Sequence, residues 1–434
     1  MPVRVDAPGN TIVVDLALCV GLAWLFGLLA SRLRQPVLLG YLLAGVVLGP
    51  NVLGVVDGQG GLRAISEIGL ALLLFLIGLE IDLKRVAAMG RVLPVATLVQ
   101  VAGSTAIGVA GCLAAGYALG GGRWDALYLG FGLALSSTVI VVKVLSDRSE
   151  LDTLPGRLTL GITVLQDLAA ILFLGLQPTL DHPGLVPVLL TFVRVGVLVG
   201  AALLISRHLL PRLFASIAGI PELVVVGSLA WCLAVAALSE ALGLSREMGA
   251  LVAGMAISTY PYALDVQAKV ASLRDLFVTV FFVLLGVGLA RPTWPVLGMG
   301  LLLVALMLAS RALTVFPTLH LLRQGRRAAF LATVGLLPVS EFALVLLSLG
   351  VAHGHVTEAT AGPMFVAFIV LAALTSYAMP QVDRLFERAR PWLDRAGIRD
   401  QADEPRSESA ELGGSDIFVL GLFREGSSFL EEGT

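Results

Sequence analysis

The chain has 434 residues, of which 57% are hydrophobic and only 14% are charged, and its formal net charge is −2. Because soluble globular domains carry about 25% charged residues, the composition excludes an ordinary water-soluble fold and indicates a membrane protein with many spans. The small net charge gives no argument for a nucleic-acid partner, and we expect none.

Apolar stretches that could cross a bilayer recur along most of the chain. A helix needs about 20 apolar residues to span the hydrocarbon core, and membrane helices tolerate Gly and Pro where neighbouring helices satisfy the backbone. We predict an all-α membrane protein with about thirteen transmembrane helices. The predicted segments are 12–31, 37–53, 64–83, 92–118, 126–146, 157–176, 185–206, 222–240, 247–258, 276–290, 295–322, 328–352 and 362–379.

Basic residues in the connecting loops indicate the orientation. With the N-terminus outside, fifteen Lys and Arg residues fall in cytoplasmic loops and five fall in outer ones. This bias agrees with the positive-inside rule. We expect a multi-pass protein of the cell inner (plasma) membrane with a cytoplasmic C-terminus, and the N-terminal sequence does not have the pattern of a cleaved signal peptide.

Three hydroxyl residues, Ser136, Ser137 and Thr138, lie near the middle of segment 126–146. Hydroxyl groups at that depth can bridge unwound backbone or ligate a small cation. They can equally bond back to carbonyl groups of their own helix, which is a common arrangement. We include them as candidate ion- or proton-binding residues.

Asp167 lies near the middle of segment 157–176, directly after Gln166. A carboxylate at mid-membrane costs at least a few kcal/mol, so it indicates ion or proton binding, or a structural partner for a buried base. Gln166 can offer an oxygen to a cation but cannot titrate; alternatively it forms a hydrogen bond between helices. We predict that Asp167 binds an ion or a proton, with Gln166 as a candidate ligand beside it.

Arg311 lies deep in segment 295–322, in the sequence LASRALTVF. Arginine stays protonated in proteins and therefore cannot carry a transported proton. It can neutralise a buried acid, for which Asp167 and Glu341 are the candidates. We expect a supporting charge pair between Arg311 and Glu341, and either a structural or a transport role fits such a pair.

Pro338 interrupts segment 328–352 just before Ser340 and Glu341. Because proline removes a backbone donor, it should break the helix there, and broken helices build midplane ion sites in transporters. A simple proline kink is the alternative. Segments 126–146 and 328–352 take the same position in two six-helix groups that run in opposite directions, which favours two inverted repeats with two crossing broken helices.

The composition changes after Met379. We divide the chain into a transmembrane domain, residues 1–385, and a cytoplasmic tail, residues 386–434. The tail holds a polar linker and then a strand–turn–helix start, with Gly421 and Gly426 around its turn. Phe423 stands where a nucleotide-binding turn has a second glycine, so we interpret this end as a truncated regulatory domain.

Seven short sequences occur in a characteristic order: GYLLAGVVLGP (40–50), LLLFLIGLEID (72–82), SSTVIVVKVLSDR (136–148), LQDLAAI (165–171), LVAGMAIS (251–258), LRDLFVTVFFVLLGVGL (273–289) and SEFALVLLSL (340–349). Together they resemble the second monovalent cation:proton antiporter family, in particular its Kef-type potassium efflux branch. The resemblance covers about residues 12 to 385.

The resemblance implies a sodium/proton antiporter-like fold of thirteen helices in two inverted repeats, usually a homodimer. Asp167 matches the family's ion-binding aspartate. Gln166 takes the place that a second aspartate has in the electrogenic sodium-exchanging branch, and Arg311 stands where that branch carries a lysine. The Kef-type branch usually continues into a nucleotide-binding domain, of which this chain holds only the first strand.

We therefore predict an antiporter of K⁺ or Na⁺ against H⁺, in which both ions compete for Asp167. A single titrating acid beside a permanently charged arginine predicts electroneutral one-for-one exchange by alternating access in the lipid bilayer. A ligand-gated potassium efflux system resembling a channel is the alternative, and a nucleotide-sensing receptor is a second one. We expect neither an enzyme nor a bound cofactor, because no catalytic triad and no metal-ligand spacing occurs.

Overall fold

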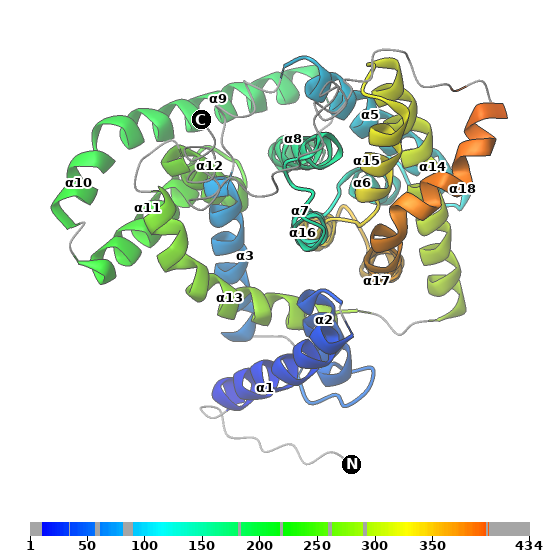
Figure 1. The fold of residues 1–434 in the computed structure, drawn as a ribbon. Helices are drawn as coiled ribbons and strands as arrows, with labels where there is room; N and C mark the ends of the chain where they lie inside the picture. The colour runs from blue at the N-terminus through cyan, green and yellow to red at the C-terminus, as the bar shows by residue number, and fades with distance from the viewer. Residues whose placement is uncertain are drawn as a thin grey trace, which may run out of the picture.

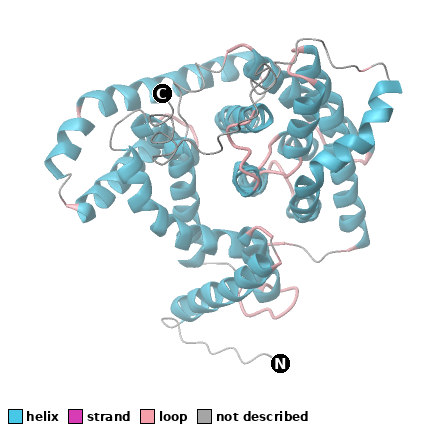
Figure 2. Cartoon of the chain, in the orientation of Figure 1, coloured by secondary structure: helices cyan, strands magenta, loops and turns pink. Residues whose placement is uncertain are grey.

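The computed structural model describes residues 11–33, 35–56, 61–80, 90–180, 184–217, 220–258, 263–289, 293–395 and 398. Across these residues the chain forms helices and no strand (Figure 2). The tail interpreted as a truncated regulatory domain lies outside the described residues, so its fold stays a prediction.

The helices follow one another closely along the chain (Figure 1). Their bounds are α1 Thr11–Arg32, α2 Val37–Leu48, α3 Gly61–Glu80, α5 Val92–Ala114, α6 Asp125–Ala134, α7 Thr138–Asp147, α8 Leu154–Leu176, α9 Leu185–His208, α10 Leu210–Ile217, α11 Pro221–Ala241, α12 Arg246–Ser258, α13 Ala263–Val287, α14 Trp294–Leu321, α15 Arg326–Gly335, α16 Glu341–Ala352, α17 Glu358–Ala378 and α18 Val382–Arg395.

Each predicted apolar segment overlaps one helix or one pair of half-helices. Among the described residues, eight helices are long and apolar enough to cross a membrane, and four shorter apolar helices accompany them. Two differences have a clear cause. The predicted segment 276–290 misses the first part of α13. This helix starts at Ala263 and continues through a charged stretch that ends at Asp275. Helix α10 was not predicted because it is short and amphipathic.

Glycines allow some of the helices to approach each other very closely. A Cβ atom on Gly45 of α2 would overlap the carbonyl oxygen of Val283 on α13, and one on Gly254 of α12 would overlap that of Phe75 on α3. Small residues at contacts let membrane helices pack backbone to backbone. These glycines therefore hold α2, α3, α12 and α13 together as one packed group.

A second group of helices repeats one order. A long helix, two half-helices and another long helix occur as α5, α6–α7 and α8, and again as α14, α15–α16 and α17. In Figure 1, α7 and α16 lie near the centre of the view, where the two broken pairs meet. An antiparallel bridge between Ser136 and Val339 joins the two interruptions.

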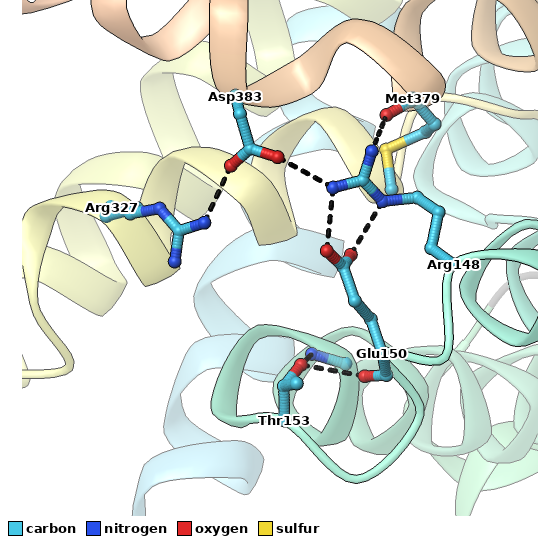
Figure 3. Close-up of polar contacts among 7 residues, drawn as sticks. Arg148, Glu150, Thr153, Arg327, Met379 and Asp383 are labelled. Atoms are coloured by element: carbon cyan, nitrogen blue, oxygen red, sulfur yellow. Dashed lines mark hydrogen bonds and ion pairs between the residues drawn. The ribbon is translucent and has the colours of Figure 1, made fainter. Parts of the chain in front are cut away.

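Helix α18 is fixed to the ends of both broken pairs by charged residues (Figure 3). Arg148, which follows α7, donates to both carboxylate oxygens of Glu150 at 2.8 and 2.6 Å and to Asp383 of α18 at 2.8 Å. Arg327 of α15 donates to the other oxygen of Asp383 at 2.6 Å. The hydrogen bond with Glu150 is the main cause that raises the pKa of Arg148, so this cation stays charged.

Apolar side chains lie beneath these ion pairs. Val141 and Leu145 of α7, Leu331 of α15 and Phe386 of α18 are buried in one cluster. Helix α18 is otherwise rich in charged residues and follows the apolar span of α17. We infer that α18 links the last membrane helix to the ends of α7 and α15.

We expect Arg148→Met to loosen α18. Arg148 is mostly buried and bonds Glu150, Asp383 and the carbonyl oxygen of Met379 at 2.9 Å, so the loss should cost about 1–2 kcal/mol. The measurement is the midpoint of thermal unfolding of the purified protein in detergent, with protease cleavage after α18 as a second readout.

The matched control is Arg390→Met on α18 itself. Its 3.6 Å pair with Glu387 is exposed on both sides, so the change should alter stability by less than about 0.5 kcal/mol. Equal midpoints for the two variants would show that Arg148 does not hold α18 in place.

Candidate functional site

The first interruption lies between α6 and α7, within residues that are almost fully buried. Helix α6 ends at Ala134, Leu135 is extended, and α7 begins at Thr138. The side chain of Ser137 accepts a weak hydrogen bond from the Ile140 N–H at 3.4 Å, which caps the start of α7. A short side-chain acceptor at this position is a usual way to begin a helix.

The second interruption, between α15 and α16, pairs with the first. Pro338 lies in it, and its carbonyl oxygen accepts from the Ser137 N–H at 2.9 Å. The N–H of Ser340, which caps α16, donates to the carbonyl oxygen of Leu135 at 3.1 Å. Unwound backbone in a membrane needs partners from the protein, and here each interruption supplies them to the other.

Arg311 of α14 is fully buried and donates to the carbonyl groups at two helix ends. Its Nη2 lies 3.0 Å from the carbonyl oxygens of both Leu133 and Ala134, at the end of α6. Its Nε lies 3.0 Å from that of Leu336, just after α15. The last carbonyls of a helix lack intrahelical donors and carry partial negative charge, so one guanidinium satisfies and neutralises both ends.

Two hydroxyl groups complete the partners of Arg311. Its Nη1 donates to Ser104 Oγ at 2.9 Å and its Nη2 to Ser136 Oγ at 3.0 Å. Within the described residues Arg311 forms no ion pair with Asp167 or Glu341, contrary to the direct charge pair with Glu341 that the sequence suggested. The physical reason is that the carbonyl groups left without partners at the two helix ends already accept hydrogen bonds from its planar guanidinium group, which has five donors.

The two acids lie instead at helix beginnings. Thr138 Oγ1, on the first residue of α7, donates to Asp167 Oδ2 at 3.2 Å. Ser137 Oγ donates to Glu341 Oε2 at 2.9 Å, and Glu341 is itself the first residue of α16. Helix beginnings carry partial positive charge, which favours a carboxylate there. Both acids are 7% exposed, so they are nearly but not completely enclosed.

We call the region where the two interruptions meet the crossing. Gln166 forms its hydrogen bonds in a different part of the crossing from its neighbour Asp167. Its Oε1 accepts from the Ser136 N–H at 2.8 Å, and its Nε2 donates to Gln100 Oε1 at 2.6 Å. Sequence reasoning missed Gln100 and Ser104 on α5. The signal was available, because a carboxamide and a hydroxyl one turn apart in an apolar segment need buried partners.

The candidate site thus separates into two sets of residues. Ser136, Gln166 and Arg311 form hydrogen bonds at the helix ends, whereas Ser137, Thr138 and the two acids meet at the helix beginnings. The first set carries a fixed charge. The second set holds carboxylates that can exchange a proton for a metal cation, because both are positive ions that an oxygen ligand accepts.

Comparisons with known proteins identify the family of the chain. A family model described as "Sodium/hydrogen exchanger, transmembrane" matches residues 18–380, which includes both broken pairs and Arg311. The chain belongs to this exchanger family. Its helices and this match make it a multi-pass membrane protein.

Several curated relatives carry transporter names. The chain is 33% identical over 358 residues to "Iron transporter MagA" of Paramagnetospirillum magneticum, covering 82% of this chain and 81% of that one. It is 29% identical over 422 residues to "K(+) efflux antiporter 6" of Arabidopsis thaliana, covering 92% and 68%. It is 30% identical over 354 residues to "Putative cation/proton antiporter YbaL" of Escherichia coli, covering 78% and 62%. Names of this kind support the Kef-type branch that the sequence resembles.

A solved structure has the same fold. The sodium proton antiporter MjNhaP1 of Methanocaldococcus jannaschii matches with a TM-score of 0.63 and 18% identity, covering 86% of this chain and 97% of that one. At this identity the likeness concerns the fold alone. It confirms the antiporter-like helical architecture expected from the sequence.

We expect Arg311→Met to destabilise the protein severely and Arg311→Lys to destabilise it less. Methionine leaves the carbonyls at both helix ends without donors, at a cost of about 3–5 kcal/mol. A lysine ammonium cannot span acceptors on both helices, so about 1–3 kcal/mol is lost. Thermal unfolding of the purified protein in detergent measures both.

A matched control for Arg311 is Arg63→Met on α3. Arg63 forms only an exposed 3.4 Å pair with Glu67, so stability should stay within about 0.5 kcal/mol. If Arg311→Lys unfolds at the wild-type temperature, the guanidinium fork is not what joins the two helix ends.

Proposed function

We propose that the chain exchanges a monovalent cation, K⁺ or Na⁺, for H⁺, with Asp167 as the group that binds either ion. One observation carries this proposal: the Asp167 carboxylate lies almost fully buried beside the start of the half-helix α7, where two broken helices meet. Half-helix ends at mid-membrane form ion sites in secondary transporters. The relatives named as potassium efflux antiporters support the same chemistry.

A stoichiometry of one cation for one proton follows from the charges of the site. Arg311 keeps a constant charge, and Gln166 is neutral, so neither adds a proton to the exchange. We assign both occupants to Asp167 and an unchanging charge to Glu341, while Ser136, Ser137 and Thr138 shape the backbone around Asp167. Exchange of this kind is electroneutral. Glu341, at the start of α16, is the supporting acid.

Alternating access requires one group of helices to move past another. The helices α5–α8 and α14–α16 share the hydrogen bonds of the crossing, and α17 packs against α14 and α16, so we assign these helices to a moving core. The group around α2, α3, α12 and α13 is joined by glycine contacts and would be the static scaffold, with a homodimer formed there. We place the C-terminal tail in the cytoplasm, so that α18 faces the inner side.

Two other transport functions have support of a different kind. A channel with a gating ligand would also use broken helices and a carboxylate. The relative named as an iron transporter makes Fe²⁺ another candidate for the transported ion. Among the described residues no three His, Cys, Asp or Glu side chains gather in a group that could hold a metal ion, which favours a monovalent cation over iron.

Asp167→Asn should abolish exchange while the protein still folds. Asparagine keeps the size of the side chain and an oxygen for the Thr138 hydroxyl, but it cannot carry a proton. We expect the rate of cation-driven internal pH change in proteoliposomes to fall by at least about 100-fold. Retained exchange would remove Asp167 from its central role.

Glu67→Gln is the matched control for this loss of one negative charge. Glu67 is exposed on α3 and remote in sequence from the crossing, so the exchange rate should be unchanged. Normal thermal unfolding of both variants in detergent shows that the loss is one of transport and not of folding.

The identity of the ions follows from a second measurement on the wild-type protein. Adding K⁺, Na⁺, Li⁺ or Fe²⁺ in turn to proteoliposomes with an internal pH dye should give proton movement with K⁺ or Na⁺. One proton should leave per cation, with no dependence on an imposed membrane voltage. A K⁺ flux without proton movement would identify a channel, and proton movement with Fe²⁺ alone would identify the iron transporter.

A further inference from the structure

Two buried glutamines close a set of hydrogen bonds where α6 ends. Gln100 of α5 and Gln166 of α8 are both 0% exposed, and they bridge the carbonyl of Ala134 and the N–H of Ser136. We propose that Gln100 is a positioning residue for the exchange: it holds the Gln166 carboxamide in one orientation and thereby fixes the helix break beside Asp167. The inference rests on the function proposed above.

The direction of every hydrogen bond in this bridge is determined by the backbone. The Ser136 N–H can only donate, so it requires the oxygen of Gln166, at 2.8 Å. The Gln166 Nε2 therefore points to Gln100 Oε1, at 2.6 Å. The remaining Nε2 of Gln100 donates to the Ala134 carbonyl, which can only accept, at 2.9 Å. Amide orientations are often ambiguous, but here both ends leave one choice.

This pattern requires a neutral group at position 166. Each member has to accept at one end and donate at the other, and a carboxamide does both. An ionised carboxylate at 166 accepts only, so Gln100 would have to turn its own oxygen toward the carbonyl oxygen of Ala134. Gln100 thus excludes a second ionised acid next to Asp167. It thereby keeps position 166 uncharged, so that Asp167 has no ionised acid directly beside it in the sequence.

The bridge is also joined to the fixed cation. Gln100 Nε2 lies 3.3 Å from Ser104 Oγ, to which Arg311 Nη1 donates at 2.9 Å. Arg311 Nη2 shares the carbonyl of Ala134 with Gln100, at 3.0 Å. Helices α5, α6, α8 and α14 therefore meet through Gln100. A change at this residue therefore reaches the helix break through Ala134 and Gln166.

Gln100→Leu tests the positioning role, with Thr97→Val as the matched control. Leucine keeps the volume but removes both ends of the bridge, so the Gln166 amide loses its fixed orientation. We expect the apparent KM for the cation to rise about tenfold and the pH midpoint of exchange to shift. Thr97 is buried one turn earlier on α5, and its hydroxyl has no hydrogen-bond partner among the described residues. Its variant should behave as wild type.

Gln100→Glu tests the direction of the hydrogen bonds, because the protonated and ionised forms of one and the same variant can be compared. When protonated, the introduced carboxyl group accepts from Gln166 and donates to Ala134, as the glutamine does. When ionised, it has no donor for Ala134. The nearby charged groups are Arg311, which favours the ionised form, and Asp167, which opposes it. We expect the exchange rate relative to wild type to be close to one at about pH 5.5 and to fall about tenfold by about pH 9.

The outcomes separate this inference from the proposed function. A raised KM in Gln100→Leu and a pH-dependent rate of Gln100→Glu relative to wild type support the inference. If Gln100→Leu fails to fold, the pH dependence of that rate ratio decides alone. Wild-type kinetics in Gln100→Leu, or a ratio that is constant with pH, would overturn it. Exchange that survives Asp167→Asn refutes the proposed function instead, whatever the Gln100 variants do.

Discussion

Two helices end in the middle of the bundle, and the carbonyl groups at their ends need donors where a membrane offers no water. Arg311 provides these donors to Leu133 and Ala134 of α6 and to Leu336 after α15. The hydrogen bonds between the two interruptions supplement it. Without this arginine, the interruption that brings Asp167 close to a helix beginning would leave several buried polar groups unsatisfied. The arginine is therefore a condition for the site and not only a neighbour of it.

Charge is distributed over the crossing in a regular way. A permanent cation lies at the two helix ends, and two acids lie at the two helix beginnings, each opposite the partial charge of the backbone. Adjacent residues connect the parts, because Ser136 bonds to Arg311 while Ser137 bonds to Glu341. In the exchange we propose, Asp167 changes its occupant without disturbing the donors at the helix ends. The residues that bond to the fixed cation and to an acid, Ser136 and Ser137, are thus adjacent in sequence but form separate hydrogen bonds.

Much of the fold could be predicted from the sequence because apolar length is a strong signal. The break at the second pair could be predicted from Pro338, whereas the first had only the cluster beginning at Ser136. The partners of Arg311 could not be predicted, because carbonyls exposed by a broken helix leave no trace in residue type. For Gln100 the sequence signals the need for a buried partner, but it does not show which residue that partner is. Its partner lies 66 residues later in the chain, and no local pattern joins them.

These contacts suggest how a change at one acid reaches the rest of the protein. Helices α5, α8 and α14 all send side chains to the end of α6, so they cannot easily shift relative to it one at a time. At the other end of α7, Arg148 and Asp383 join this group to α18. A helix group held at both places should move as a unit, as the alternating access that we propose requires. The pair Gln100–Gln166 joins α5 to α8 without adding charge, so under the proposed exchange the energy of moving the loaded site would depend on Asp167 and its bound ion.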